Sequence, residues 1–203
     1  MRDIDKALEE IGAIRSQIAS HTAFRGYGPV AIAITGVLAL LTAAAQSLFA
    51  IAPTPLLYCS EWLATAAICG AVVRFEMQGR SRRLHSGLAD EMIHQAIEQF
   101  LPATVASVFM PLLLVQFAPD SIWLMPGLWQ LFVALGIFAS LHNLPPPIFA
   151  AAAFYLVSGF ACLLWGSQSH HLSPWAMGIP FLAGQSLMAA ILYFAAGEND
   201  AED

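Results

Sequence analysis

Apolar residues in this chain are gathered into six long runs that are separated by short, more polar links. A spanning helix needs about 20 mostly apolar residues, because each residue rises about 1.5 Å and the hydrocarbon core is about 30 Å thick. The runs therefore predict six transmembrane helices, at 29–51, 57–73, 102–118, 121–141, 147–165 and 175–196. Runs of about ten alternating polar and apolar residues, as in membrane β-barrels, do not occur, so we predict an all-α fold.

Two further segments have helical patterns outside these runs. In residues 1–28 one helical face is apolar, and it carries Ile4, Leu8, Ile11 and Ile18. A helix lying on anionic lipid is rich in Lys and Arg, whereas this one has more acidic than basic residues up to residue 22. We therefore predict a cytoplasmic amphipathic helix and elbow that faces a protein partner or a second copy of the chain. Residues 75–101 are predicted to form a cytoplasmic connector, and residues 197–203 an acidic cytoplasmic tail.

The composition supports a membrane protein and excludes several other classes. Of the 203 residues, 58% are hydrophobic and only 11% are charged, against about 25% charged in soluble domains. These charged side chains are too few to cover the surface of a water-soluble fold of this size. The net charge of −6 also argues against nucleic-acid binding, which normally needs a basic protein. The expected partner is the lipid bilayer, and no nucleic acid.

The basic residues predict the orientation in the membrane. All eight lie before the first run or after the second: Arg2, Lys6, Arg15, Arg25, Arg74, Arg80, Arg82 and Arg83. Cytoplasmic loops are enriched in Lys and Arg, so six crossings place both termini of this multi-pass protein in the cytoplasm. Tryptophans gather near the opposite ends of the runs: Trp62, Trp123, Trp165 and Trp175, with Trp129 slightly deeper. They predict an aromatic belt at the outer interface.

Short outer links predict that the helices pair as three antiparallel hairpins. Each hairpin would open with a proline near its inner start, at Pro29, Pro102 and Pro147. Because lipid is as apolar as the helices, helix packing depends on small residues that let two backbones approach. Such residues recur in the first, second and fifth runs: Ala31, Thr35, Ala39, Ala43, Ala66, Gly70 and residues 150–153. We expect these faces to lie against other helices.

Glu61 is the one clearly intramembrane charged residue, about four residues into the second run. Intramembrane acids typically serve in proton relays or cation binding, and no intramembrane Lys or Arg offers Glu61 a partner. A position about 6 Å from the outer end of the helix also lets the side chain reach outer water without any functional role. The sequence leaves both interpretations open.

Amides and prolines inside the runs allow two further interpretations. The polar residues in or near the runs are Gln46, Gln116, Gln130, Gln185 and Ser186. Buried amides make interhelical hydrogen bonds; alternatively, Gln130 and Gln185 line a cavity with Glu61 that is open to the outside. Pro111, Pro126 and Pro180 would break the helices around such a cavity, as in transporters.

One pair of residues has the spacing of metal ligands. Glu91 and His94 lie three residues apart, and a carboxylate and an imidazole on one helix face can bind a metal, as in Glu-x-x-His bundle sites. Those sites need a second such motif, which the sequence lacks, so an exposed polar helix face explains the pair more simply. The six histidines precede or end the runs or lie in links, which does not favour haem. We expect no cofactor.

Short motifs spread over about half of the chain resemble those of a known group of proteins. They are Phe24-Arg25-Gly26-Tyr27-Gly28-Pro29, Glu61-Trp62, Phe100-Leu101-Pro102 and Met125-Pro126-Gly127-Leu128-Trp129. With them the chain resembles uncharacterised six-span bacterial inner-membrane proteins that are often encoded beside small helix-turn-helix regulators. The resemblance implies a bacterial inner membrane and a regulatory or stress-linked role, and it supplies no catalytic or binding residues.

The sequence contains no P-loop, nucleophile elbow, zinc signature or glycine fingerprint, so we predict a non-enzymatic protein. The main hypothesis is a binding, sensing or regulatory module whose N-terminal helix contacts a partner. The alternative is a small secondary transporter or channel that uses Glu61 and the intramembrane glutamines.

Overall fold

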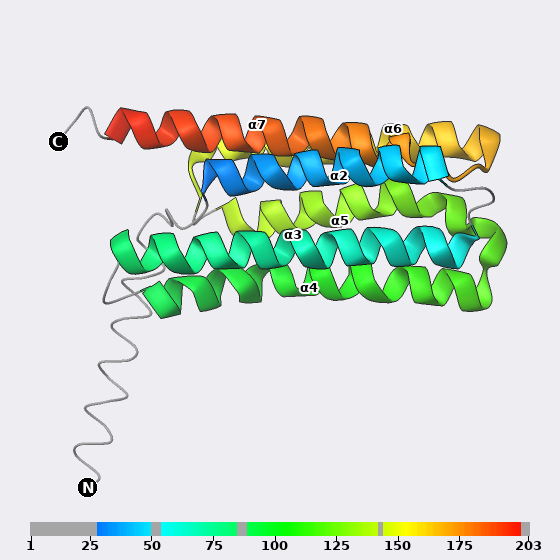
Figure 1. The fold of residues 1–203 in the computed structure, drawn as a ribbon, viewed down its shortest axis with the longest axis horizontal. Helices are drawn as coiled ribbons and strands as arrows, with labels where there is room; N and C mark the ends of the chain where they lie inside the picture. The colour runs from blue at the N-terminus through cyan, green and yellow to red at the C-terminus, as the bar shows by residue number, and fades with distance from the viewer. Residues whose placement is uncertain (1–27, 50–53, 85–88, 142–143, 200–203) are drawn as a thin grey trace, which may run out of the picture.

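A computed structural model describes residues 28–49, 54–84, 89–141 and 144–199, with the side chains of residues 80–84, 89–93 and 196–199 outside the description. Over these residues the chain forms six long helices that lie side by side in an elongated bundle (Figure 1). All six are long and apolar enough to cross a membrane, which confirms the all-α prediction and is compatible with an integral membrane protein. The predicted partner-facing residues Ile4, Leu8, Ile11 and Ile18 lie outside the described residues.

The helices follow the predicted runs, with the largest differences at the second and third. The long helices are α2 (Pro29–Phe49), α3 (Pro55–Leu84), α4 (Ala89–Phe117), α5 (Met125–Ser140), α6 (Phe149–Ser169) and α7 (Trp175–Asn199). Short 3-10 turns, η1 (Pro119–Leu124) and η3 (Pro146–Ile148), lead into α5 and α6. Most of the predicted connector, residues 75–101, therefore extends α3 and α4, and this extension gives the two short runs the length that a span needs.

Proline begins the helices less regularly than predicted. α2 starts at Pro29, where the missing N–H would have no intrahelical partner in any case. Pro147 lies in η3, just before α6. Pro102, however, lies inside α4, so the prediction that it opens the third span is wrong. The helical pattern of the residues before Pro102 simply continues through it.

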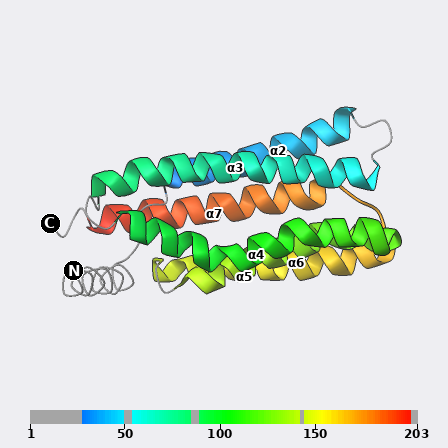
Figure 2. The same cartoon turned by 90° about the horizontal axis from the view of Figure 1, so that it is seen from below.

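The six helices form two layers of three (Figure 2). One layer holds α2, α3 and α7, and the other holds α4, α5 and α6. The most extensive contacts are those of α2 with α7 and of α5 with α6. The main packing partners are therefore not the neighbours in the predicted hairpins, and α6 and α7 lie in different layers.

Small residues let α2 and α7 approach closely. The predicted stripe on α2 is buried: Ala31, Thr35, Ala39 and Ala43. A Cβ atom placed on Gly178 of α7 would lie only 2.5 Å from the Cβ of Ala43, and one on Gly36 of α2 would lie 2.9 Å from the Cβ of Gln185. Residue numbers rise along α2 as they fall along α7 at these contacts, so the two helices are antiparallel.

Small residues also let α5 and α6 approach closely, but the small residues of α3 do not contact another helix. A Cβ atom on Gly127 would lie 2.8 Å from the carbonyl oxygen of Gly159, and Ala151 and Ala152 are fully buried. On α3, in contrast, Ala66 and Gly70 are exposed, and a Cβ atom on Gly70 would meet no atom within 4 Å. The prediction that these two residues face another helix is wrong, because α3 turns a different, aromatic and polar face toward the bundle.

Candidate functional site

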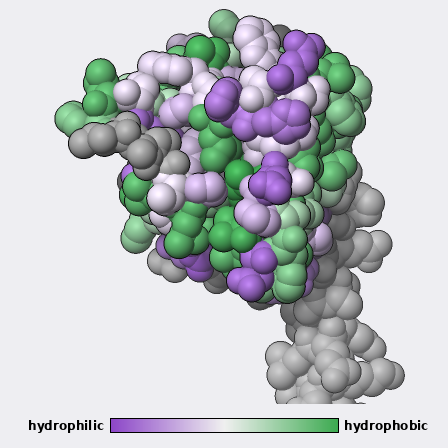
Figure 3. Space-filling model, turned by 90° about the vertical axis from the view of Figure 1, so that its right-hand side faces the viewer, coloured by the Kyte–Doolittle hydropathy of each residue, from purple (hydrophilic) through white to green (hydrophobic). Residues whose placement is uncertain are grey.

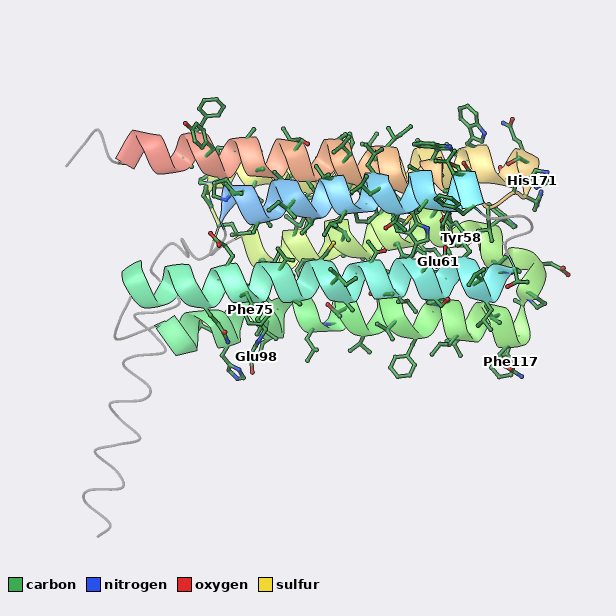
Figure 4. The ribbon with its side chains drawn as sticks, in the orientation of Figure 1. Tyr58, Glu61, Phe75, Glu98, Phe117 and His171 are labelled. Carbon is green, nitrogen blue, oxygen red and sulfur yellow. The ribbon has the colours of Figure 1, made fainter. Side chains whose placement is uncertain are left out.

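Polar side chains are concentrated between helices near the end of the bundle where α3, α5 and α7 begin, which we call the Glu61 end. Tyr58 and Glu61 lie toward the same end as Phe117 and His171, whereas Phe75 and Glu98 lie toward the other (Figure 4). Viewed from this end, the surface shows hydrophilic residues among hydrophobic ones (Figure 3).

Glu61 is held by a pre-oriented hydrogen-bond donor. Its Oε2 accepts a hydrogen bond of 2.5 Å from Nε2 of Gln46 on α2. The Gln46 side chain is buried, and its Oε1 accepts a hydrogen bond of 3.0 Å from Nε1 of Trp62. An indole N–H can only donate, so Trp62 fixes the amide of Gln46 with its NH₂ group toward Glu61.

No cation neutralises Glu61 among the side chains that the structure describes. The Glu61 side chain is half-buried, and no described Lys, Arg or His nitrogen lies within 4 Å of its carboxylate. Within the same residues, no group donates a hydrogen bond to its second oxygen, Oε1. A half-buried carboxylate with one donor and a free oxygen is suited to bind a proton, a metal cation or an ammonium group.

The polar contact between α2 and α3 continues away from the Glu61 end. The hydroxyls of Thr42 and Thr65 lie 2.8 Å apart, and each also lies within 3.0 Å of a carbonyl oxygen of its own helix. A hydroxyl has one hydrogen, so when one of the two donates to the other it gives up its own carbonyl. About one turn further along α3 and two turns further along α2, the thiol of Cys69 lies 3.9 Å from the carbonyl oxygen of Thr35. Hydrogen bonds, rather than the small residues that we predicted on α3, therefore join these two helices.

A buried tryptophan donates a hydrogen bond to the backbone carbonyl that a proline leaves unpaired in α4. Pro111 has no N–H, so the carbonyl of Ser107, four residues earlier, has no helical donor. Nε1 of Trp129 on α5 donates to that carbonyl at 2.8 Å. α4 therefore continues through Pro111 with its freed carbonyl paired, which is compatible with a position inside a membrane.

Gln130, the next residue of α5, donates in the same way to a carbonyl that a proline leaves unpaired in α7. Pro180 leaves the carbonyl of Ala176 without a helical donor, and Nε2 of Gln130 donates to it at 3.0 Å. The same Nε2 donates to the carbonyl of Pro126 at 3.0 Å, and the thiol of Cys162 lies 3.9 Å from the Ala176 carbonyl. Gln130 is fully buried, and its Oε1 accepts no hydrogen bond from any described residue.

The structure does not bring Glu61, Gln130 and Gln185 into one cavity. Gln185 lies against Gly36, and the partner of Glu61, Gln46, lies ten residues further along α2, about 15 Å away by helix rise. Gln130 instead contacts the start of α7. The other prediction for buried amides, interhelical hydrogen bonding, is confirmed for Gln46 and Gln130.

The predicted tryptophan belt needs a correction. Trp165 and Trp175 are 79% and 42% exposed, as residues of an interfacial belt should be. Trp62 and Trp129, by contrast, are only 4% and 6% exposed. Their indole N–H groups find partners inside the bundle, so these two rings belong to the core and its polar network.

The predicted metal ligands lie far from this network. Nε2 of His94 lies 3.1 Å from Oε1 of Glu98, and both side chains are exposed, at 73% and 61%. The side chain of Glu91 is outside the described part of the chain. Within that part, no group of three His, Cys, Asp or Glu residues could hold a metal ion. His94 therefore pairs along its own helix on an exposed face.

Two members of the site were not singled out from the sequence. Gln46 is one of several intramembrane amides, but it extends the buried stripe of Ala39 and Ala43 by one more turn, and that spacing is a usable signal. Tyr58 is fully buried one turn before Glu61, with its hydroxyl 3.4 Å from the carbonyl oxygen of Ser173. Its contact with a residue 115 positions away leaves no local sequence signal.

Comparisons with known proteins find no match for this chain. The chain matches no protein-family model, and neither a curated protein nor a solved structure is similar to it.

Proposed function

We propose that this protein is a non-enzymatic, multi-pass protein of a cell inner membrane that binds a cation at the Glu61–Gln46 pair. One observation carries the proposal: a half-buried carboxylate receives an oriented amide donor, while no described Lys, Arg or His neutralises it. Keeping a carboxylate in a membrane bundle is costly, so such a residue usually serves a ligand. The predicted topology, with both termini in the cytoplasm, makes the Glu61 end the outer one.

A cation that binds the folded protein must stabilise it, and this gives a direct test. At a ligand concentration about 100 times the dissociation constant, the gain in free energy of unfolding is about 2.7 kcal/mol. We would follow the midpoint of thermal unfolding in detergent while adding NaCl, KCl, ammonium chloride or choline chloride separately, and while lowering the pH. At least one of these should stabilise the wild-type protein.

The decisive variant is Glu61→Gln, which keeps the shape of the side chain and removes its charge. We expect it to abolish the stabilisation by the effective cation. Glu98→Gln is the matched control, because Glu98 is an exposed carboxylate at the other end of the bundle. Equal stabilisation of the wild-type and Glu61→Gln proteins by every probe would contradict the proposal.

Flux measurements then separate transport from sensing. Reconstituted into liposomes, a transporter or channel would move the stabilising cation, and Glu61→Gln would abolish that movement. Binding without flux would favour the sensing or regulatory hypothesis. That hypothesis places a partner on the N-terminal helix, so it predicts that a membrane pull-down loses a protein when residues 1–22 are removed.

A further inference from the structure

The start of α7 is held by side chains from three other helices. We consider Ser173 to Met177, the first turn of α7 and the two residues before it, and call it the 173–177 turn. Gln130 of α5 donates to the carbonyl of Ala176 at 3.0 Å, and Cys162 of α6 lies 3.9 Å from the same oxygen. The hydroxyl of Tyr58 on α3 lies 3.4 Å from the carbonyl of Ser173.

Backbone hydrogen bonding is interrupted on both sides of this turn. On the far side, Pro180 cannot donate to Ala176, so one helical bond is missing there. On the near side, α6 ends at Ser169, the following residue His170 has a left-handed backbone with φ 53°, and residues 170–173 form no regular structure. A segment between a loop and a proline can pivot as a unit, because proline is a common point of helix bending.

The 173–177 turn lies at the same level of the bundle as the Glu61 site, because it contacts Tyr58, one turn before Glu61. Gly178 of α7 packs against Ala43 of α2, and the two helices are antiparallel. Three residues beyond Ala43, toward the Glu61 end, is Gln46, the partner of Glu61; the residues of α7 at that level are those that precede Gly178. Moving the turn outward would therefore open the α7 side of the buried Gln46, which holds the half-buried Glu61.

We propose that the 173–177 turn is a gate over the Glu61 site, hinged at Pro180 and held closed by Gln130 and Tyr58. The gate would control the access of a cation to the Glu61–Gln46 pair. This inference therefore rests on the proposed function. In the closed state Gln130 replaces the donor that Pro180 lacks. When the turn swings away, this bond and the Tyr58 contact break together.

The native thiol of Cys162 reports directly on this gate, because it lies next to Ala176. We would measure its alkylation by N-ethylmaleimide in lipid nanodiscs, and resolve the three cysteines by peptide mass spectrometry. Gln130→Leu removes the hydrogen bond to Ala176, and should speed alkylation of Cys162 about three- to tenfold. Pro180→Ala restores the backbone donor and should slow it.

Cys69 is the internal reference, because it is half-buried on α3 beside Thr35, which lies eight residues, about 12 Å by helix rise, before the residue that Gly178 contacts, Ala43. Its alkylation rate should stay constant in both variants. An unchanged Cys162 rate in Gln130→Leu would overturn the gate, and so would an equal rise at Cys69, since that would mean loosening of the whole bundle. These rates need no cation, so they can fail while the Glu61→Gln result stands, and the reverse.

Discussion

Replacing Gly178 by alanine adds one methyl group at a close contact between α2 and α7. The new Cβ would lie 2.5 Å from the Cβ of Ala43 and 3.4 Å from the carbonyl oxygen of Ala39. Carbon atoms in contact normally lie about 3.5–4.0 Å apart, so the two helices must separate by about 1 Å or more. Ala43 has no side-chain rotamer that could relieve the contact, so the backbones themselves have to move.

Two opposing terms set the size of the effect. Crowding a well-packed interior costs about 1–3 kcal/mol, while alanine is favoured over glycine inside a helix by up to about 1 kcal/mol. Gly70→Ala isolates the second term, because a Cβ atom there meets nothing within 4 Å. The difference between the two variants is therefore the packing term alone, and we expect Gly178→Ala to be less stable than Gly70→Ala by about 1–3 kcal/mol.

Reversible unfolding in mixed detergent micelles measures this difference as a free energy, and thermal unfolding gives an independent ranking. For a chain of this length, each kcal/mol corresponds to a shift of about 2–4 °C in the unfolding midpoint. If Gly178→Ala proves as stable as Gly70→Ala, or more so, the close approach of α2 and α7 is not the interaction that we describe. A smaller gap, of the expected sign, would show that the interface relaxes.

Two further variants test the polar contacts that hold the bundle. Trp129→Phe removes the donor to the Ser107 carbonyl and should lower the free energy of unfolding by about 1–3 kcal/mol. In a Pro111→Ala background the restored N–H replaces that donor, so the same substitution should cost less. An equal loss in both backgrounds would refute the role of the proline. For the hydroxyl pair, a double-mutant cycle of Thr42→Val and Thr65→Val in the same unfolding assay should give a coupling of about 0.6 kcal/mol between α2 and α3, whereas strictly additive losses would mean that the 2.8 Å contact contributes nothing.

The sequence by itself determined the number, type and approximate limits of the long apolar helices found in the described residues. Local hydrophobicity decides whether a helix of about 20 residues is stable in lipid, and it does not depend on which other helices surround that helix. It also identified the small-residue face of α2 and singled out Glu61 as an acid within an apolar run. These are properties of single helices, readable from spacing and composition alone.

Only the tertiary structure decided which helices meet and what each polar residue does there. Several helices carry small residues on one face, but only some of these faces contact another helix: Gly178 packs against Ala43, whereas Gly70 is exposed. The donors for the two proline-freed carbonyls are consecutive residues of α5, tens of positions away from the carbonyls in sequence. In lipid the hydrophobic effect does not select a partner among helices, so close backbone approach and the pairing of buried polar groups select it, and both depend on the whole assembled bundle.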